Sequence, residues 1–373
     1  MSMGSAMATT LRAILADRAA LVTMIVAVVI YGFYYPEAYR HQAVDRLPVA
    51  VVDLDGSALS RSLLRDLDTL RGVRIASEPG SLADAEGHVH AGRADAILLV
   101  LPGFGTAVLR GERGQLAVFG NGSNLLRASS ALTALGEGIA GFAVEAGREQ
   151  ARFLGAPAGP ALHLVQRPLY NTRVGYGSTV VPAVGQLIAQ QTLLIGMVLV
   201  LAGWRERRGA RLVMPAATFA GVAACFVLVG LFSSAYFAGF VPWFQDYPRG
   251  GNPAALALAI PAFVLAVVAF GLFIGSFFRV RERALLFLLP VALPMYFLSG
   301  VSWPVQAIPA PLTWLGALVP STHGIPLLLK LNQVGAHWRE TAAELASLAA
   351  LTLLHGALAW WRYRPGRAGH DPD

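Results

Sequence analysis

Charged residues divide this chain into long uncharged stretches and short links. Runs without Asp, Glu, Lys or Arg lie between Arg18 and Glu37, Arg173 and Arg205, Arg211 and Asp246, Arg249 and Arg279, Arg283 and Lys330, and Glu344 and Arg362. A bilayer core ~30 Å thick is crossed by roughly 20 apolar helical residues, and a charge within it is costly. The pattern predicts a polytopic membrane protein.

The run before Lys330 is too long for one membrane-crossing helix. Its second half carries the helix-breaking residues Pro304, Pro309, Pro311, Pro320 and Pro326. We therefore expect one span over about Ala284–Gly300, followed by broken or re-entrant helices over about residues 301–329. This interpretation gives six spans in total, whereas two spans in this run would give seven.

The first apolar run, Ala19–Tyr35, could be an uncleaved anchor or a signal peptide. No small-x-small cleavage site follows it, so we favour the anchor. Before this run, Leu11, Ile14 and Leu15 are spaced for one face of a helix. They predict a short helix at the membrane interface.

The polar segment after the first span has the length of one folded domain. Short apolar runs predict strands over Leu47–Val52, Ala94–Val100 and Gln115–Phe119. Ser57 is a good N-cap for a helix over Ala58–Leu70, and a long helix over Leu125–Phe153 precedes a linker over Gly155–Pro160.

The predicted fold is an α-helical polytopic membrane protein of six spans with an α/β domain inserted after span 1. We predict the domains as residues 1–36 (interfacial helix and span 1), 37–177 (the α/β domain) and 178–373 (five spans with broken helices at about 301–329).

Composition agrees with a membrane protein: 55% of the residues are hydrophobic and only 14% are charged, against roughly 25% charged in soluble domains. The net charge of +7 does not indicate nucleic acid, because the arginines cluster at the ends of apolar runs. The single cysteine, Cys225, excludes a disulfide within the chain.

Arginine is concentrated in the links after the second and fourth spans and in the C-terminal tail. These arginines are Arg205, Arg207, Arg208 and Arg211; Arg279, Arg281 and Arg283; and Arg362, Arg364 and Arg367. Arginine-rich sides face the cytoplasm. Both termini are then cytoplasmic, and the polar segment lies outside.

Two motifs in the polar segment are open to an enzymatic or a metal-binding interpretation. Asp53 and Asp55 follow a strand, as in haloacid-dehalogenase-type phosphatases, but the segment has no lysine and no later acidic pair for magnesium. We favour a capping role at the strand–helix turn. His88 and His90 without a third ligand nearby indicate a solvated loop rather than a metal site.

Three glutamines interrupt the second span. Gln186 and Gln190 share a helical face, and Gln191 is adjacent. Hydrogen bonding between helices is the favoured interpretation, and a polar stripe that lines a translocation path is the alternative.

The polar segment resembles the permease subunits of type-2 ATP-binding-cassette (ABC) exporters. The similar stretches are Val51–Ser57 with Leu59–Ser62, Gly92–Ala96 to Pro102–Phe104 with Arg110–Gly111, Asn121–Asn124, and Pro168–Asn171.

The C-terminal half carries the most diagnostic motif, Leu298–Pro304 with Ile308–Pro309 and Val319–Pro320, in which Trp303 replaces the usual Phe. The loop Arg205–Arg211 departs from the family pattern, because it is shorter and lacks the usual Thr and second acid.

The resemblance implies a bacterial inner-membrane exporter permease that works as a homo- or heterodimer with two cytoplasmic ABC ATPase subunits. It implies no cofactor on this chain, contact with membrane lipid, and a possible periplasmic adaptor as a further partner. There is no Gly-x-x-x-x-Gly-Lys loop, so ATP hydrolysis falls to the ATPase, and this chain is not an enzyme by itself. The alternative is a membrane-anchored ligand-binding or envelope-assembly protein with a periplasmic sensor domain.

Two sets of residues are the candidate sites. The ATPase-coupling candidates are Arg205, Glu206, Arg207, Arg208, Gly209, Arg279 and Arg281. The pathway-lining candidates are Gln186, Gln190 and Gln191.

Overall fold

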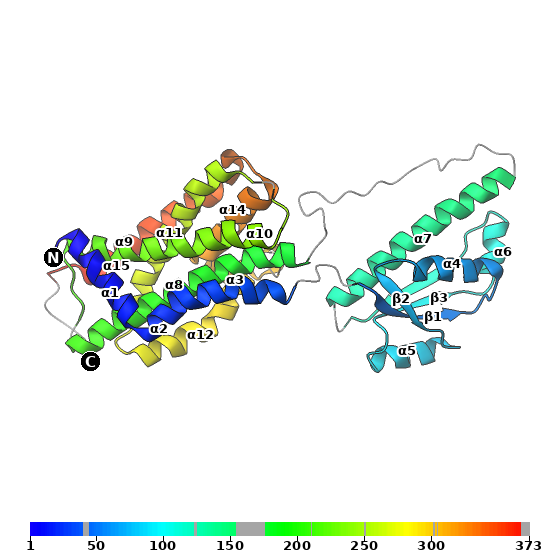
Figure 1. Cartoon of the computed structure of the whole chain (residues 1–373), viewed down its shortest axis with the longest axis horizontal. Helices are drawn as coiled ribbons and strands as arrows, with labels where there is room; N and C mark the ends of the chain where they lie inside the picture. Colours follow the sequence, from blue (N-terminus) through cyan, green and yellow to red (C-terminus); the bar gives the residue numbers. More distant parts are fainter. Residues whose placement is uncertain are drawn as a thin grey trace. The chain divides into compact units, whose positions relative to one another are not determined.

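The computed structural model describes residues 1–39, 45–122, 125–153, 176–209, 211–249, 251–300, 303 and 305–366. The predicted linker Gly155–Pro160, the motif Pro168–Asn171 and parts of the motifs at 121–124 and 298–304 lie outside these residues. The chain divides into two compact units (Figure 1). Unit 1 is Met1–Gln42 with Pro168–Asp373, and unit 2 is Ala43–Arg167.

Unit 1 is a bundle of helices. In chain order the elements are α1 Met3–Ala16, α2 Arg18–Leu21, η1 Val22–Val26, α3 Ala27–Glu37, α8 Tyr176–Arg208, α9 Ala216–Ala235, η2 Tyr236–Phe240, α10 Val241–Phe244, α11 Pro253–Gly275, α12 Arg281–Leu298, η3 Val305–Ala307, α13 Ala310–Ala317, α14 Pro320–Leu329, η4 Lys330–Val334, η5 Trp338–Thr341 and α15 Ala342–Tyr363.

Five helical segments in the described part of the chain are long and apolar enough to cross a membrane. They are Arg18–Glu37, Gly177–Arg208, Ala216–Phe244, Pro253–Gly275 and Trp338–Tyr363. A bent pair, Ala310–Ala317 with Pro320–Val334, adds a sixth if it counts as one span. The number of spans is therefore five or six by length and composition.

The proline-rich stretch differs in detail from the expectation. α12 covers the span predicted over Ala284–Gly300, but it is not among the five because Arg281, Glu282 and Arg283 occupy its first turn. After it, α13 and the α14–η4 segment are bent by 81° with respect to each other. Val319 is extended and Pro320 begins α14, where a missing N–H costs nothing.

The α8 helix lies at the centre of unit 1, and its apolar window is 83% buried. Leu194, Met197 and Leu201 are inaccessible to solvent, and they belong to a core shared with α9, α11, α14 and α15. A helix that is apolar on all sides is one that neighbours surround. The second span therefore acts as the axis on which the other helices pack.

The N-terminal helix α1 packs against α9 through small residues. Ala6, Thr10 and Ile14 are buried, whereas Leu11 and Leu15 are exposed. A Cβ on Gly221 of α9 would lie 2.3 Å from the carbonyl oxygen of Met3 and 2.7 Å from Cβ of Ala6. Glycine at position 221 thus permits the backbones of the two helices to approach.

Unit 2 holds a small mixed sheet with helices on both faces (Figure 1). Its elements are β1 Leu47–Asp53, α4 Ala58–Asp68, β2 Val73–Ser77, α5 Leu82–His90, β3 Ala96–Val100, α6 Phe104–Leu109, β4 Leu116–Gly120 and α7 Leu125–Phe153. The strand order is β2-β1-β3-β4. β1 is parallel to β2 and β3, and β4 is antiparallel to β3.

Alternation along β1 builds two apolar layers. Val49 and Val51 pack with α4 and α7, while Ala50 and Val52 pack with α5 on the other face. The predicted strands and helices at β1, α4, β3, β4 and α7 are confirmed.

The edge strand β2 and the helix α5 were not predicted. Each is short, and α5 buries only Ala85, so neither leaves a clear apolar period in the sequence. The prediction of a solvated loop at His88 and His90 is wrong, because both residues belong to the last turn of α5. His88 Nδ1 lies 2.7 Å from Oγ of Ser77 on β2.

Candidate functional site at the basic end of the bundle

Polar side chains from several helices meet at one end of unit 1, which we call the basic end. It consists of Asp17, Arg205, Glu206, Arg211, Arg281 and Arg362 with their hydrogen-bond partners. These residues come from the α1–α2 junction, the end of α8 and the loop after it, the start of α12 and the end of α15. Three of the seven coupling candidates, Arg205, Glu206 and Arg281, are among them.

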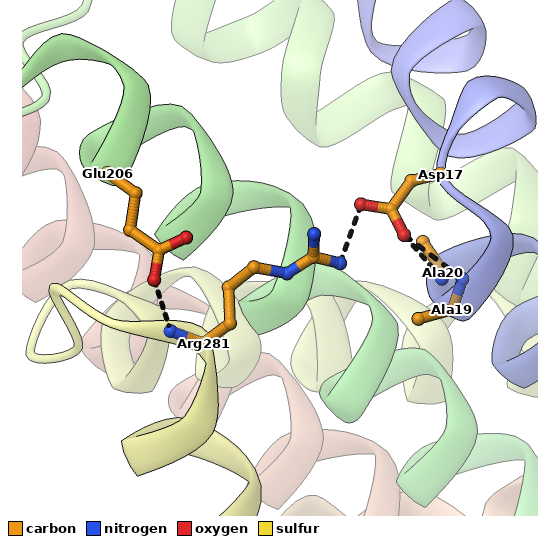
Figure 2. A network of polar contacts seen from close by, with 5 residues as sticks. All are labelled: Asp17, Ala19, Ala20, Glu206 and Arg281. Carbon is orange, nitrogen blue, oxygen red and sulfur yellow. Dashed lines mark hydrogen bonds and ion pairs between the residues drawn. The ribbon is translucent and has the colours of Figure 1, made fainter.

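Asp17 joins the N-terminal helices to α12 (Figure 2). Its Oδ2 lies 2.6 Å from Nη2 of Arg281, and both side chains are partly buried. Its Oδ1 accepts hydrogen bonds of 3.1 and 3.2 Å from the N–H groups of Ala19 and Ala20. Asp17 is thus an ion-pair partner and the N-cap of α2, and α1 ends at this residue.

Arg281 also links α12 to α8, through its backbone. Its N–H donates to Oε1 of Glu206 over 2.8 Å, as Figure 2 shows. A carboxylate at a helix N-terminus is favourable because the first N–H groups are unpaired and the helix dipole is positive there. Arg281 therefore connects three segments through two different groups: its guanidinium binds Asp17, and its amide binds Glu206.

The electrostatic environment keeps Asp17 ionised. Partial burial by itself raises the pKa of this carboxyl, but the hydrogen bond from Arg281, those from Ala20 and Ala19, and the Arg281 charge outweigh it. The net result is a pKa below the usual value of 3.8. At neutral pH the Asp17–Arg281 pair is fully charged.

Arg205 faces the interior of the bundle. Only 8% of the residue is exposed. Its Nη1 donates to the carbonyl oxygens of Ser276 and Phe278, at 2.7 and 2.9 Å, at the end of α11. Its guanidinium also lies 5.7 Å from the ring centre of Tyr363. The expectation that Arg205 donates directly to an ATPase does not fit this position, because the residue is buried and its Nη1 caps α11.

The next residues of α8 do face outward. Arg207, Arg208 and Gly209 are exposed, and Gly209 ends the helix with a left-handed φ of +61°. Its N–H bonds to the carbonyl oxygen of Arg205 over 2.9 Å, as in glycine-terminated helices. Arg279, before α12, is also exposed. The coupling candidates thus separate into two groups. Arg205, Glu206 and Arg281 bond to other segments of the bundle, although Glu206 is itself exposed. The outer group is Arg207, Arg208, Gly209 and Arg279.

The three glutamines of the second span are buried between helices. Gln186 exchanges two hydrogen bonds with Ser234 of α9: its Nε2 donates to the carbonyl oxygen, and its Oε1 accepts from Oγ. Gln190 Nε2 donates to Oγ of Ser321 on α14, and Gln191 Nε2 lies 3.0 Å from Sδ of Met295 on α12. These contacts support the packing interpretation, and lining of a path by these residues stays a prediction.

In unit 2 the Asp53 and Asp55 carboxylates are engaged by the turn itself. Asp53 Oδ1 accepts from the N–H groups of Asp55 and Gly56, both at 3.0 Å, and Oδ2 accepts from Oγ of Ser60 at 2.7 Å. Asp55 Oδ2 accepts from the N–H of Gly105 at 3.0 Å. A hydrogen bond from Ser57 is the main reason why the pKa of Asp55 is lowered. This arrangement supports the capping interpretation over the phosphatase one.

Comparison with known families decides between the classes of membrane protein considered. The sequence profile of the family described as ABC-2 family transporter protein matches residues 18–361. The chain belongs to the ABC-2 transporter family. The match includes the broken helices after α12, unit 2 and the basic end except for Asp17 and Arg362. It confirms the resemblance seen in the sequence motifs.

Two relatives from Escherichia coli strain K12 are named as permeases. This ABC-2 protein is 24% identical over 364 residues to the inner membrane transport permease YhhJ. The match covers 95% of this chain and 94% of YhhJ. It is 26% identical over 215 residues to the probable multidrug ABC transporter permease YbhR. The second match covers 56% of this chain and spans only 58% of the length of YbhR.

Proposed function

We propose that this protein is the membrane-spanning permease subunit of an ABC exporter of the bacterial inner membrane. It moves an unidentified substrate out of the cytoplasm with ATP that a separate subunit hydrolyses. The observation that carries the proposal is the family match over residues 18–361. The permease names of both relatives and the five or six candidate spans support it.

In the proposed complex the cytoplasmic ATPase docks on the outer group of coupling candidates. Arg207 and Arg208 are exposed and adjacent, so they are available for charge-assisted hydrogen bonds to partner carboxylates. Glu206 and Arg281 lie directly behind them and connect α8 to α12 and to Asp17. Movement of the docked ATPase would then be passed to α1 and α12 as rigid bodies.

The proposed assembly contains two permeases, either two copies of this chain or this chain and a related one. Unit 2 would be periplasmic, where it meets substrate or an adaptor, and both termini would be cytoplasmic. The arginine bias of the links supports this orientation.

Reversing the outer charges should detach the ATPase. We expect the double variant Arg207→Glu/Arg208→Glu to lose co-purification of the co-expressed ABC ATPase about tenfold or more, because attraction becomes repulsion. The amount of permease in the membrane should not change. Measurement is by affinity purification of the full-length permease, followed by quantitation of ATPase and of ATP turnover.

The matched control is Arg339→Glu. Arg339 is exposed and lies in η5, directly before α15, whereas Arg362 of the basic end lies at the other end of that helix. The control variant should bind the ATPase normally. Equal ATPase recovery from the double variant would show that docking does not use this loop. Failure of the unmodified chain to bind any ABC ATPase would overturn the permease proposal in favour of the membrane-anchored sensor.

The proposed orientation predicts opposite labelling of two engineered cysteines. In a Cys225→Ala background, we expect Gly80→Cys to react with a membrane-impermeant maleimide from outside, and Arg208→Cys to react only after permeabilisation. Gly80 is suitable because an added Cβ would meet no atom within 4 Å, and Arg208 is exposed. The reverse pattern would show that the polar unit is cytoplasmic.

A further inference from the structure

Among the described residues, three arginines of the basic end have no acidic partner. Arg205 donates to the carbonyl oxygens of Ser276 and Phe278, and Arg362 donates to Ser276. Arg211 donates to the carbonyl oxygen of Arg362. Within the described ranges none of the three forms an ion pair with a carboxylate. By contrast, Arg281 at the same end is neutralised by Asp17.

The three charges are close together. Nη1 of Arg205 lies 2.7 Å, and Nη2 of Arg362 lies 3.0 Å, from the same carbonyl oxygen of Ser276. These two nitrogens are therefore at most 5.7 Å apart, the sum of the two distances. Arg211 donates to the carbonyl oxygen of Arg362, and the charges of Arg211 and Arg362 both act on Arg205. Burial weakens the screening of this repulsion by water.

Helix dipoles compensate only part of the charge. The carbonyl ends of α11 and α15 each supply about half a negative charge, against three positive ones, so about two positive charges remain. Arg205 is 8% exposed, and its Nε has no acceptor among the described residues. The described residues therefore leave at least one donor of this cluster without an acceptor.

The cluster lies where spans end. Arg205, Ser276 and Arg362 are within three residues of the ends of the segments Gly177–Arg208, Pro253–Gly275 and Trp338–Tyr363. Span ends lie at the level of the lipid headgroups. The exposed aromatic residues Phe277 and Trp361 accompany them, and the Arg362 guanidinium lies 4.6 Å from the ring centre of Phe277. Charged donors beside exposed rings match a headgroup and the adjoining acyl chain.

We propose that Arg205, Arg211 and Arg362 form a binding site for the phosphate group of an anionic membrane phospholipid. The phosphate accepts hydrogen bonds from the guanidinium groups, of which those of Arg211 and Arg362 are half-buried, and neutralises the cluster. The acyl chain packs against Phe277 and Trp361. Basic recesses between the ends of membrane helices bind anionic lipids in this way. The site is distinct from the outer group proposed for the ATPase, whose residues are exposed.

The test uses the full chain, delipidated in a neutral detergent. Dioleoyl phosphatidylglycerol is titrated, with phosphatidylcholine and inorganic phosphate as comparison probes. Bound lipid is counted by native mass spectrometry, and the melting temperature is recorded. We expect phosphatidylglycerol, but neither comparison probe, to bind and to raise the melting temperature. Arg211→Gln/Arg362→Gln should weaken this binding about tenfold or more, as expected for lost charge-assisted hydrogen bonds.

The control Arg283→Gln/Arg364→Gln removes two exposed arginines from α12 and from the residue after α15, and it should bind phosphatidylglycerol like the unmodified chain. Equal binding of the two lipids, or undiminished binding by Arg211→Gln/Arg362→Gln, would overturn the proposal. A full stabilisation by inorganic phosphate would also overturn it, in favour of a free anion. If Arg211→Gln/Arg362→Gln does not fold, the single variant Arg211→Gln takes its place. Binding of phosphatidylglycerol, phosphatidylcholine and inorganic phosphate is then compared between this variant and the unmodified chain, and the same outcomes support or overturn the proposal.

Discussion

Replacing Asp17 with Asn is expected to lower the free energy of unfolding by about 1–2 kcal/mol, the range for a half-buried charged hydrogen bond. Asn keeps the side-chain oxygen that caps α2, so the loss reports on the ion pair with Arg281. Asp17→Ala should lose about 1 kcal/mol more, because it also removes the cap. Unfolding of the purified chain by SDS in mixed micelles measures both.

A double-mutant cycle separates the pair from other effects. Arg281→Gln removes the guanidinium but retains the N–H that donates to Glu206. We expect Asp17→Asn and Arg281→Gln to be non-additive by about 1 kcal/mol or more. Arg283→Gln, in the same first turn of α12 but exposed, is the control and should be near neutral. Additive single effects would show that the pair contributes nothing.

The pH dependence follows from the lowered pKa of Asp17. A carboxyl whose pKa is lower in the folded chain stabilises the fold above its unfolded pKa. This stabilisation is lost as the pH falls through the folded value. The contribution of the pair should therefore be constant near neutrality and disappear only below about pH 3.8. The Asp17→Asn variant should lack this acid-dependent component.

Replacing Gly221 with Ala is expected to displace the N-terminal helix. The new Cβ would lie 2.3 Å from the carbonyl oxygen of Met3, which cannot rotate away as a side chain can. Overpacking of this kind costs about 1–3 kcal/mol. We expect hydrogen exchange in residues 3–16 to become about tenfold faster or more, which corresponds to about 1.4 kcal/mol, while unit 2 is unchanged.

Gly356→Ala is the matched control for this substitution. Gly356 is also in a candidate span, but its Cβ would meet only Cβ of Ala269 at 4.0 Å, an ordinary contact. It should not change exchange in α1. Equal exchange in α1 for Gly221→Ala and the unmodified chain would show that α1 is not held by this close approach.

Several elements of unit 2 could be predicted from the sequence. Runs of β-branched and aliphatic residues with a clear N-cap, as at Leu47–Val52 and Ser57, specify their elements locally, and these were found within one or two residues. The edge strand β2 and the helix α5 were missed because they are short and bury few side chains. Their positions depend on pairing with β1 and packing against the sheet.

Within the candidate site, the sequence identified the residues but not their directions. Arg205, Arg207 and Arg208 lie within four residues and are chemically the same in the sequence, and an arginine-rich link is explained by topology alone. Only the folded bundle separates buried Arg205, which caps α11, from exposed Arg207 and Arg208. The pairing of Asp17 with Arg281 joins residues 264 positions apart, so no local pattern could indicate it.

By itself the sequence determined the class of protein, because the cost of placing charge in hydrocarbon leaves uncharged runs of membrane-crossing length. Its motifs also determined the family. The tertiary structure alone decided which charges are used inside the bundle and which remain outside. That choice depends on where helix ends meet. The carbonyl groups at the end of α11, which have no partner within the helix, attract Arg205 and Arg362, and the first N–H group of α12 attracts Glu206.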